Sequence, residues 1–254
     1  TKGAQPVPPA DQYDAEVLAD SPAIYYKLEE SSGTAAEDSS GNGRDGTYQG
    51  APDFEEAGPF DGTVGVLFNG TDARLAPDAA YSPTITNFTF ECWVKIPNGA
   101  NPTNATLISW QENGGSDGGI ATGFGNAPGG LGATGAFWCG WTEPFVVEIT
   151  YTNAATFNNG NWHHLVCVWD GTAGVQFDAS QITIYVDGVA VAVTEASFGD
   201  KGGTAPYTTN RAMFAGTLAA GWDNFVNCTM ARVAVYETAL SQARVEAHYA
   251  ASGL

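Results

Sequence analysis

The sequence predicts an all-β fold, an antiparallel β-sandwich with a short helix near each end. Residues 162–171 (WHHLVCVWDG) and 182–188 (ITIYVDG) are rich in β-branched and aromatic residues. Each run ends in Asp-Gly, which is a strong hairpin-turn signal. The composition, with 32 Gly, 13 Pro and 12% aromatic residues, is typical of short strands joined by many turns.

The chain is expected to form one domain, residues 13–254, preceded by an extended arm, residues 1–12. Three prolines in the arm disfavour regular secondary structure. A single domain of this size buries roughly 70–75% of the surface that its unfolded chain exposes, so a self-sufficient core is feasible.

A short helix is predicted at residues 14–19, capped by Asp14 and ended before Pro22. Strands are then expected at residues 23–28, 46–48, 64–68 and 87–96.

The last of these strands alternates between two faces. We expect one face in the core, and it carries Phe88, Phe90, Cys92 and Val94. The other face carries Trp93 between Glu91 and Lys95. Two interpretations of Trp93 remain open, a ligand-facing surface or a side chain covered by a loop, and the second is favoured.

Two loop-rich insertions are predicted, at about residues 97–160 and 198–212, from their glycine clusters. Strands are expected within or after them at residues 106–110, 136–141, 145–151 and 213–217. A final helix is predicted from Ser241 through Tyr249. No internal repeat is present.

The two Asp-Gly motifs, followed near the C-terminus by RVAVYETALS (residues 232–241), resemble the core of laminin-G-like domains of the concanavalin A-like lectin/glucanase group. The run DSSGNGRDGTY (residues 38–48) resembles the Gly-rich turn near the entry to such domains. The resemblance extends from about Tyr13 to the C-terminus, with a divergent middle. It implies a jelly-roll arrangement of the sandwich.

The net charge of −19 arises from 9 Lys and Arg against 28 Asp and Glu. A basic surface that could bind phosphate backbones is therefore not expected, and nucleic acid is excluded as a partner. Anionic membranes are disfavoured for the same reason. Neither a leader peptide nor an apolar run long enough to span a bilayer is recognised, so no membrane insertion is expected.

The four cysteines lie far apart and form no C-x-x-C pair, which argues against a zinc knuckle. Cys92 and Cys167 fall in predicted core strands, where a free thiol acts as a small hydrophobe. Cys139 and Cys228 lie beside aromatic-rich loops, and a disulfide between them remains open.

Catalysis is not expected. The resemblance implies that a hydrolase of this group would carry E-x-D-x-x-E or E-x-D-x-E on one strand, and no such run occurs. Retaining hydrolysis needs two carboxyl groups about 5–5.5 Å apart. The adjacent pairs Glu29-Glu30 and Glu55-Glu56 diverge to opposite faces of an extended chain. A glycoside hydrolase remains the less favoured alternative.

Ca²⁺ is the one cofactor that the sequence suggests. Residues 38–43 (DSSGNG) are similar to the start of a calcium loop, so the candidate ligands are Asp38, Asn42 and Asp45. Gln49 replaces the glutamate that would complete an EF-hand, and an Asx-type turn is favoured. The resemblance also implies a structural calcium held by acidic residues in the last strand. Ala231 and Arg232 stand there instead.

A sugar-binding platform is the third candidate site, because carbohydrate sites stack an aromatic face on a pyranose ring. The candidate aromatic residues are Trp110, Trp138, Trp141 and Trp222, and the candidate polar companions are Asn113, Asn126, Asp223 and Asn224. Packing of these tryptophans onto the sandwich, or a protein–protein contact, is favoured over sugar stacking. The resemblance assigns Trp162 and Trp169 to the core.

The sequence thus predicts a non-catalytic surface recognition or decoration module. The favoured setting is a virion surface, as a phage head decoration or tail-associated protein. It would bind a cell-surface or extracellular glycan and contact other virion or assembly proteins through its N-terminal arm. The protein is also expected to be an oligomer. The alternative is a secreted bacterial carbohydrate-binding adhesin module with an extracellular location.

Overall fold

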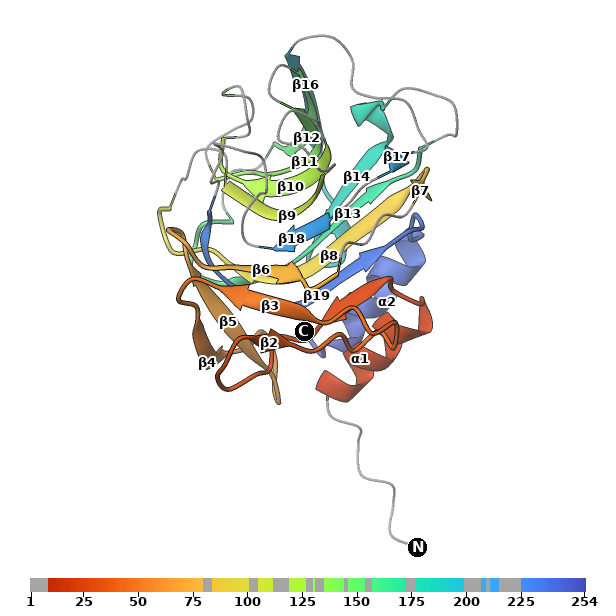
Figure 1. The fold of residues 1–254 in the computed structure, drawn as a ribbon. Helices are drawn as coiled ribbons and strands as arrows, with labels where there is room; N and C mark the ends of the chain where they lie inside the picture. Colours follow the sequence, from red (N-terminus) through yellow and green to blue (C-terminus); the bar gives the residue numbers. More distant parts are fainter. Residues whose placement is uncertain are drawn as a thin grey trace, which may run out of the picture.

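The structure is a computed structural model. It describes residues 9–79, 84–100, 105–111, 119–126, 130, 135–143, 146–153, 157–171, 177–198, 207–208, 211–214 and 225–254. Two large antiparallel sheets pack face to face, with one helix near each end of the chain (Figure 1). The predicted β-sandwich is confirmed.

Among the described residues, one sheet, which we name sheet A, has eight strands. Its spatial order is β15 (Val189–Ala190), β14 (Ile182–Val186), β13 (Trp162–Trp169), β8 (Phe88–Lys95), β19 (Asn227–Tyr236), β5 (Val64–Asn69) and β4 (Asp53–Ala57). The eighth strand, β1 (Ile24–Tyr26), pairs with β19.

The opposite sheet, sheet B, has nine strands in the described part of the chain. Its order is β16 (Val193–Phe198), β12 (Val146–Thr152), β11 (Phe137–Glu143), β10 (Gly119–Phe124), β9 (Ala105–Gln111), β18 (Arg211–Phe214), β6 (Arg74–Pro77), β3 (Gly46–Gln49) and β2 (Ala35–Ala36). Two further strands, β7 (Thr84–Ile85) and β17 (Tyr207–Thr208), pair with each other.

The two Asp-Gly motifs end two neighbouring strands of sheet A, because β13 pairs with β14. Asp187 and Gly188 both have positive φ angles, 52° and 76°, as the tight turn into β15 requires. The Asp187 carboxylate accepts a hydrogen bond from the backbone N–H of His164 at 2.9 Å, which ties this turn to β13. Asp170-Gly171 ends β13 but is not a two-residue hairpin, since β14 begins only at Ile182.

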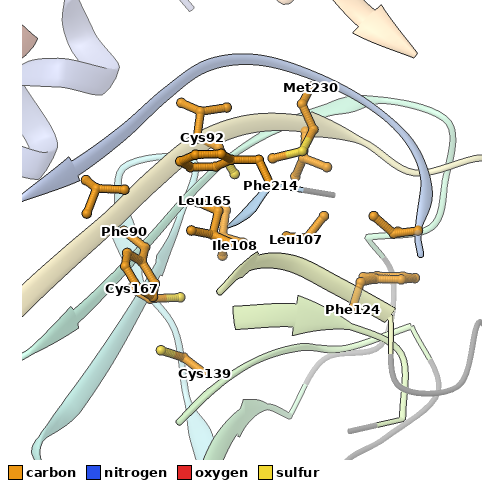
Figure 2. Packing of buried hydrophobic residues seen from close by; sticks show 14 of the residues in the cluster. Phe90, Cys92, Leu107, Ile108, Phe124, Cys139, Leu165, Cys167, Phe214 and Met230 are labelled. Carbon is orange, nitrogen blue, oxygen red and sulfur yellow. The ribbon is translucent and has the colours of Figure 1, made fainter. Parts of the chain in front are cut away.

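The main hydrophobic core lies between the sheets. Phe88, Phe90, Cys92 and Val94 of β8 all belong to it, as their alternation predicted. Figure 2 shows two of them, Phe90 and Cys92. All four cysteines are buried and free. The structure therefore contains no disulfide between Cys139 and Cys228.

The outer face of sheet A is covered by the two helices, α1 (Pro9–Ala19) and α2 (Gln242–Ala251), which lie side by side (Figure 1). Trp93 is 1% exposed there. Its ring lies 6.2 Å from that of Tyr13 on α1 and 5.9 Å from that of Tyr249 on α2. The ring of Phe60, in the loop between β4 and β5, lies 5.4 Å from that of Trp93. Trp93 is thus covered by a loop, as favoured, and by both helices, and it does not face a ligand.

Helix α1 begins at Pro9, five residues before the predicted start at Asp14. Proline suits the first turn of a helix, where its missing N–H has no partner to lose. Residues 9–12 therefore belong to the helix and not to an extended arm. Asp14 is not a cap; it is buried, accepts a hydrogen bond from the Tyr25 hydroxyl at 2.5 Å and pairs with Lys27 at 2.7 Å.

Both ends of the described fold meet on this side of the molecule. A Cβ placed on Gly253 would lie 3.5 Å from the Pro9 side chain. Within the described residues, no helix is long and apolar enough to cross a membrane.

Candidate functional site

Two of the predicted platform tryptophans are buried. Trp141 lies in the main core, where its ring is 6.2 Å from that of Phe177. Trp138 is on the opposite face of β11 and is 0% exposed. Its indole lies over Gly123 of β10, since a Cβ on that glycine would be 2.3 Å from Trp138 Cζ2. In these positions neither indole offers a free face to a sugar. Trp138 and Trp141 are therefore corrected as platform candidates, and the favoured interpretation, that they pack onto the sandwich, holds for both.

The other platform candidates are only partly described. Trp110 is on β9, opposite Ile120, but its side chain lies outside the described residues. Asn126 is half-buried beside the end of β10. Asn113, Trp222, Asp223 and Asn224 lie outside the described residues. The structure therefore does not assemble these side chains into one site.

The Asp38 loop is an Asx-type turn. Asp38 Oδ1 accepts hydrogen bonds from the N–H groups of Ser40 and Tyr25, both at 3.0 Å. Asp38 Oδ2 accepts from the N–H of Arg44 at 2.9 Å and from the Ser40 hydroxyl at 2.8 Å. The favoured interpretation is confirmed, because each carboxylate oxygen already has two donors.

The other two candidate ligands are also engaged. The Asn42 amide donates to the carbonyls of Pro22 and Ala23, and Asp45 Oδ1 accepts from the Asp38 N–H at 2.9 Å. No cluster of three His, Cys, Asp or Glu side chains suited to a metal occurs among the described residues. As arranged here, this loop does not fit Ca²⁺, which takes six to eight oxygen ligands.

The last strand carries a buried cation where the family resemblance implied acidic ligands. The guanidinium of Arg232 is 1% exposed, with Nη2 2.5 Å from Glu29 Oε1 and Nε 3.3 Å from Asp14 Oδ1. Arg232 also lies over the Phe60 ring, 5.8 Å from its centroid. Burial alone would lower the pKa of Arg232, but Asp14 and Glu29 raise it. A second cation at this place would be repelled, so the residues do not fit calcium here either.

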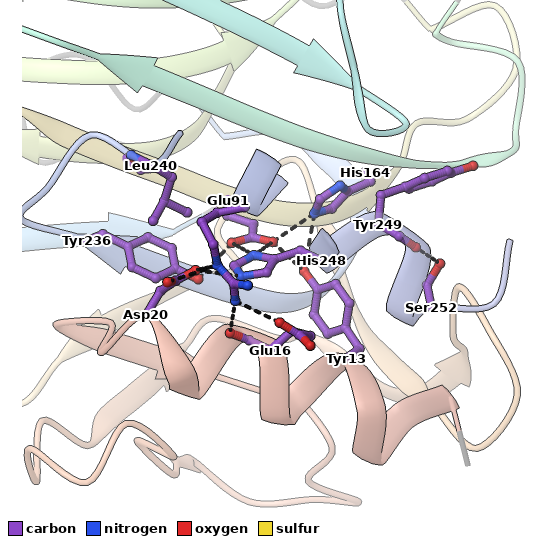
Figure 3. A network of polar contacts seen from close by, with 12 residues as sticks. Tyr13, Glu16, Asp20, Glu91, His164, Tyr236, Leu240, His248, Tyr249 and Ser252 are labelled. Atoms are coloured by element: carbon purple, nitrogen blue, oxygen red, sulfur yellow. Dashed lines mark hydrogen bonds and ion pairs between the residues drawn. The ribbon is translucent and has the colours of Figure 1, made fainter. Parts of the chain in front are cut away.

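The densest group of titratable side chains surrounds Glu91 on the outer face of sheet A (Figure 3). The Glu91 carboxylate is fully buried and accepts hydrogen bonds from four side chains. These are the hydroxyls of Tyr13 and Tyr236, both at 2.8 Å, His164 Nε2 at 2.8 Å and His248 Nδ1 at 3.0 Å.

His248 connects this carboxylate to the start of the fold. Its Nε2 lies 2.9 Å from Asp20 Oδ2, so each ring nitrogen faces a carboxylate. Arg244 then joins Asp20 at 2.8 Å and Glu16 at 2.7 Å. Since α1, α2, β8, β13 and β19 all contribute, the network holds both helices against sheet A.

The pKa shifts agree with a charged network. Burial alone would raise the pKa of Glu91, but His248 and the hydrogen bond from His164 hold it well below its usual range. Burial alone would lower the pKa of His248, but Glu91 and Asp20 raise it. Perturbed pKa values can mark a catalytic site, yet Glu91, His164 and His248 are all 0% exposed. No substrate reaches them, and their role is structural.

A groove of about 480 Å³ opens on the outer face of sheet A, beside the start of α2. We name it the outer groove. It is lined by Asn87, Val168, Asp170, Thr183, Tyr185, Thr238, Ala239, Leu240, Ser241 and Gln242. These residues come from the turn before β8, the end of β13, the outer face of β14 and the segment that leads into α2.

The outer groove combines an apolar wall with unpartnered polar groups. Val168, Tyr185 and Leu240 form the apolar part. Among the described residues, the side chains of Asn87, Asp170 and Thr183 have no hydrogen-bond partner. The groove can therefore accept a ligand that has hydroxyl groups on one side and carbon on the other.

No pattern in the sequence predicts this groove. Its residues come from four segments that are far apart in the chain and share no motif. Asp170 was noticed only as part of a turn signal. The alternation of β14 places Thr183 and Tyr185 on one outer face, which was the one local clue.

Comparisons with known proteins agree with the fold. A laminin-G-type family profile, described as the concanavalin A-like lectin/glucanases superfamily, matches residues 68–246. Among curated protein sequences, none matches the chain.

Three solved structures illustrate the likeness. Domain 4 of AbnA, an extracellular arabinanase from Geobacillus stearothermophilus solved with arabinotriose, is 16% identical with a TM-score of 0.57; the match covers 89% of this chain and 97% of that one. The binding domain of Paraclostridial Mosquitocidal Protein 1 is 14% identical with a TM-score of 0.59, over 91% and 52% of the two chains. The binding domain of botulinum neurotoxin DC, in complex with SialylT, is 11% identical with a TM-score of 0.60, over 92% and 52%. The chain thus spans about half the length of the two toxin domains.

Proposed function

The chain belongs to the concanavalin A-like lectin/glucanase superfamily, and we propose that it binds neutral oligosaccharides in the outer groove without cleaving them. The observation that carries this proposal is that the side chains of Asn87, Asp170 and Thr183, beside the apolar wall, have no hydrogen-bond partner in the part of the chain that the structure describes. A volume of about 480 Å³ is within the usual range for small-ligand pockets.

The charge of the protein favours a neutral ligand. With a net charge of −19 and the Asp170 carboxylate in the groove, an anionic sugar would be repelled. A neutral sugar can instead donate its hydroxyl protons to Asp170 and exchange hydrogen bonds with Asn87 and Thr183. Tyr185 and Val168 would contact the carbon face of the ring.

The chemistry of the groove supports binding rather than hydrolysis. Asp170 is the one carboxylate among the lining residues, whereas glycoside hydrolysis by a carboxylate pair needs two. Domain 4 of the arabinanase was solved with arabinotriose, which is a neutral oligosaccharide, and belongs to an extracellular protein. These two points support a non-catalytic, extracellular binding domain.

Replacing Asp170 by alanine is expected to weaken oligosaccharide binding by about 10- to 100-fold, since a hydrogen bond to a charged group contributes about 1.5–3 kcal/mol. The measurement is a glycan array followed by calorimetry on the best ligand, in calcium and again in EDTA. Binding should be equal in both buffers.

Asp53→Ala is the matched control, because it removes an exposed carboxylate from the edge strand β4, which does not line the groove. Equal affinity of the Asp170→Ala variant and the wild type would show that sugars bind elsewhere. Selective binding of sialylated glycans would contradict the neutral-ligand proposal.

Two settings suit such a binding domain. On a virion surface, as a phage head decoration or tail-associated protein, the domain would assemble through residues 1–8, which precede α1. As a secreted bacterial adhesin module it would act as a monomer. Light scattering on the full chain and on a variant lacking residues 1–8 distinguishes the two settings. An oligomer that dissociates when residues 1–8 are deleted supports the virion setting. A monomeric full chain supports the adhesin.

A further inference from the structure

The four buried cysteines are the part of the core that the proposed function does not use. Figure 2 shows three of them, Cys92, Cys139 and Cys167, between the two sheets. Cys139 is on β11 of sheet B, whereas Cys92, Cys167 and Cys228 are on sheet A. A bond from Cys139 to any of the others would therefore join the two sheets.

The structure places one of these thiols directly against Cys139. Thr122 on β10 is the partner opposite Cys139 in the β10–β11 pairing, so the two side chains share one face of sheet B. The Thr122 Oγ1 atom lies 3.3 Å from the Sγ atom of Cys167, across the interior. Cys167 thus reaches from sheet A onto the Thr122–Cys139 pair.

The other pairs of cysteines are less favourable for a disulfide that joins the sheets. Cys92 and Cys167 are on neighbouring strands but not opposite each other, because Cys92 pairs with Leu165 and Cys167 with Phe90. Both of these cysteines are on sheet A, so a bond between them would not join the two sheets. Cys228 pairs with Phe68, toward the β5 side of sheet A.

We propose that Cys139 and Cys167 form a disulfide that joins sheet B to sheet A when the protein folds in the presence of a small-molecule disulfide such as oxidised glutathione. One cysteine, as thiolate, attacks a glutathione sulfur and releases one glutathione thiolate. The second cysteine, as thiolate, then attacks the mixed disulfide and releases the other. Two cysteine thiols lose their protons and are oxidised, and one glutathione disulfide is reduced to two thiols.

The disulfide is expected to form while the protein folds and not after it has folded. Cys139 and Cys167 are both 0% exposed, and burial raises the pKa of the Cys139 thiol well above its usual value. A protein that has already folded in its reduced form should therefore react slowly. Once formed, the bond constrains the unfolded chain between β11 and β13 and is expected to raise the melting temperature by roughly 10 °C.

The test is to unfold the full chain with reductant, refold it with a mixture of oxidised and reduced glutathione, and measure its intact mass and its linked peptides. We expect a loss of about 2 Da and a peptide pair that joins Cys139 to Cys167. Refolding with reduced glutathione alone gives the matched reduced protein for the melting comparison.

Four single variants locate the bond. Cys139→Ala and Cys167→Ala should abolish the mass change, and Cys92→Ala and Cys228→Ala should retain it. Native protein that keeps four free thiols after oxidative refolding would overturn the proposal, as would a linked peptide pair that joins other cysteines. The wild-type peptide map gives this answer even if a variant fails to fold.

Discussion

Replacing Glu91 by glutamine is expected to reduce the free energy of unfolding by about 3–5 kcal/mol, the usual loss when one member of a buried ion pair is removed. Glutamine has nearly the same shape but no charge to balance His248. Its amide would also direct N–H donors at groups that are donors themselves. Urea denaturation of the wild type and the variant measures the difference.

The same variant should change how stability depends on pH. The pKa of His248 is raised in the folded protein, so protonated His248 stabilises the fold. This contribution to the free energy of unfolding is complete below pH 6.5, roughly the pKa of histidine in an unfolded chain, and is lost as the pH rises through the pKa of the folded protein. The pKa of Glu91 is lowered, so the ionised Glu91 also stabilises the fold. Its contribution to the free energy of unfolding is present above about pH 4.5 and is lost as the pH falls. Wild-type stability should therefore decline on both sides of this window.

In the Glu91→Gln variant the decline above pH 6.5 should be smaller, because only Asp20 still stabilises the His248 cation. Glu237→Gln is the control, since Glu237 is exposed on the adjoining turn. Its stability should stay within about 0.5 kcal/mol of the wild type. A Glu91→Gln protein as stable as this control would mean that the network adds nothing to stability.

Replacing Arg232 by methionine is expected to lower the free energy of unfolding by about 3 kcal/mol. Methionine retains much of the volume and the contact with Phe60, but Asp14 keeps only Lys27 and Tyr25 as partners. The unfolding midpoint in urea, at a fixed pH of 7, measures the loss.

A double variant tests whether the loss of the Asp14–Arg232 ion pair causes this loss of stability. Asp14→Asn combined with Arg232→Met should be more stable than the sum of the two single changes predicts, because it removes the buried carboxylate that has lost its Arg232 partner. Arg244→Met is the control; Arg244 pairs with Glu16 and Asp20 but its side chain is 33% exposed, so a loss of about 0–1 kcal/mol is expected. If Arg232→Met lost no more stability than this control, the buried pair with Asp14 would contribute nothing beyond a surface pair.

The sequence identified the strands whose side chains alternate strongly and missed those with small or acidic residues. Residues 87–96 were predicted close to the observed limits of β8, because large apolar residues recur there at every second position. The run 162–171 was recognised as a strand from its β-branched and aromatic residues and its final Asp-Gly, and β13 ends just before that Asp-Gly. Strand β10 (GIATGF) was not predicted, since glycine and alanine have weak strand preference. Its glycines are needed there, because Gly123 makes room for the ring of Trp138.

The alternation of side chains along a strand also does not indicate which segment of the chain covers the outer face of that strand. Glu91 and Trp93 were assigned correctly to the face away from the core, but their partners come from α1 and α2, at the two ends of the chain. The candidate site failed for a related reason. Tryptophans that no strand pattern demanded are the platform candidates, with packing favoured over sugar stacking, and Trp138 and Trp141 are indeed buried. The outer groove instead forms from distant segments without a motif.

The closeness of Pro9 and Gly253 also bears on how the domain can be re-engineered. Because the two ends of the fold meet, a short linker could join them without crossing either sheet. A circularly permuted chain, opened at an exposed turn between two strands, would then retain every strand pairing. For the same reason the whole domain could be inserted into a surface loop of a host protein, attached at what is effectively a single point.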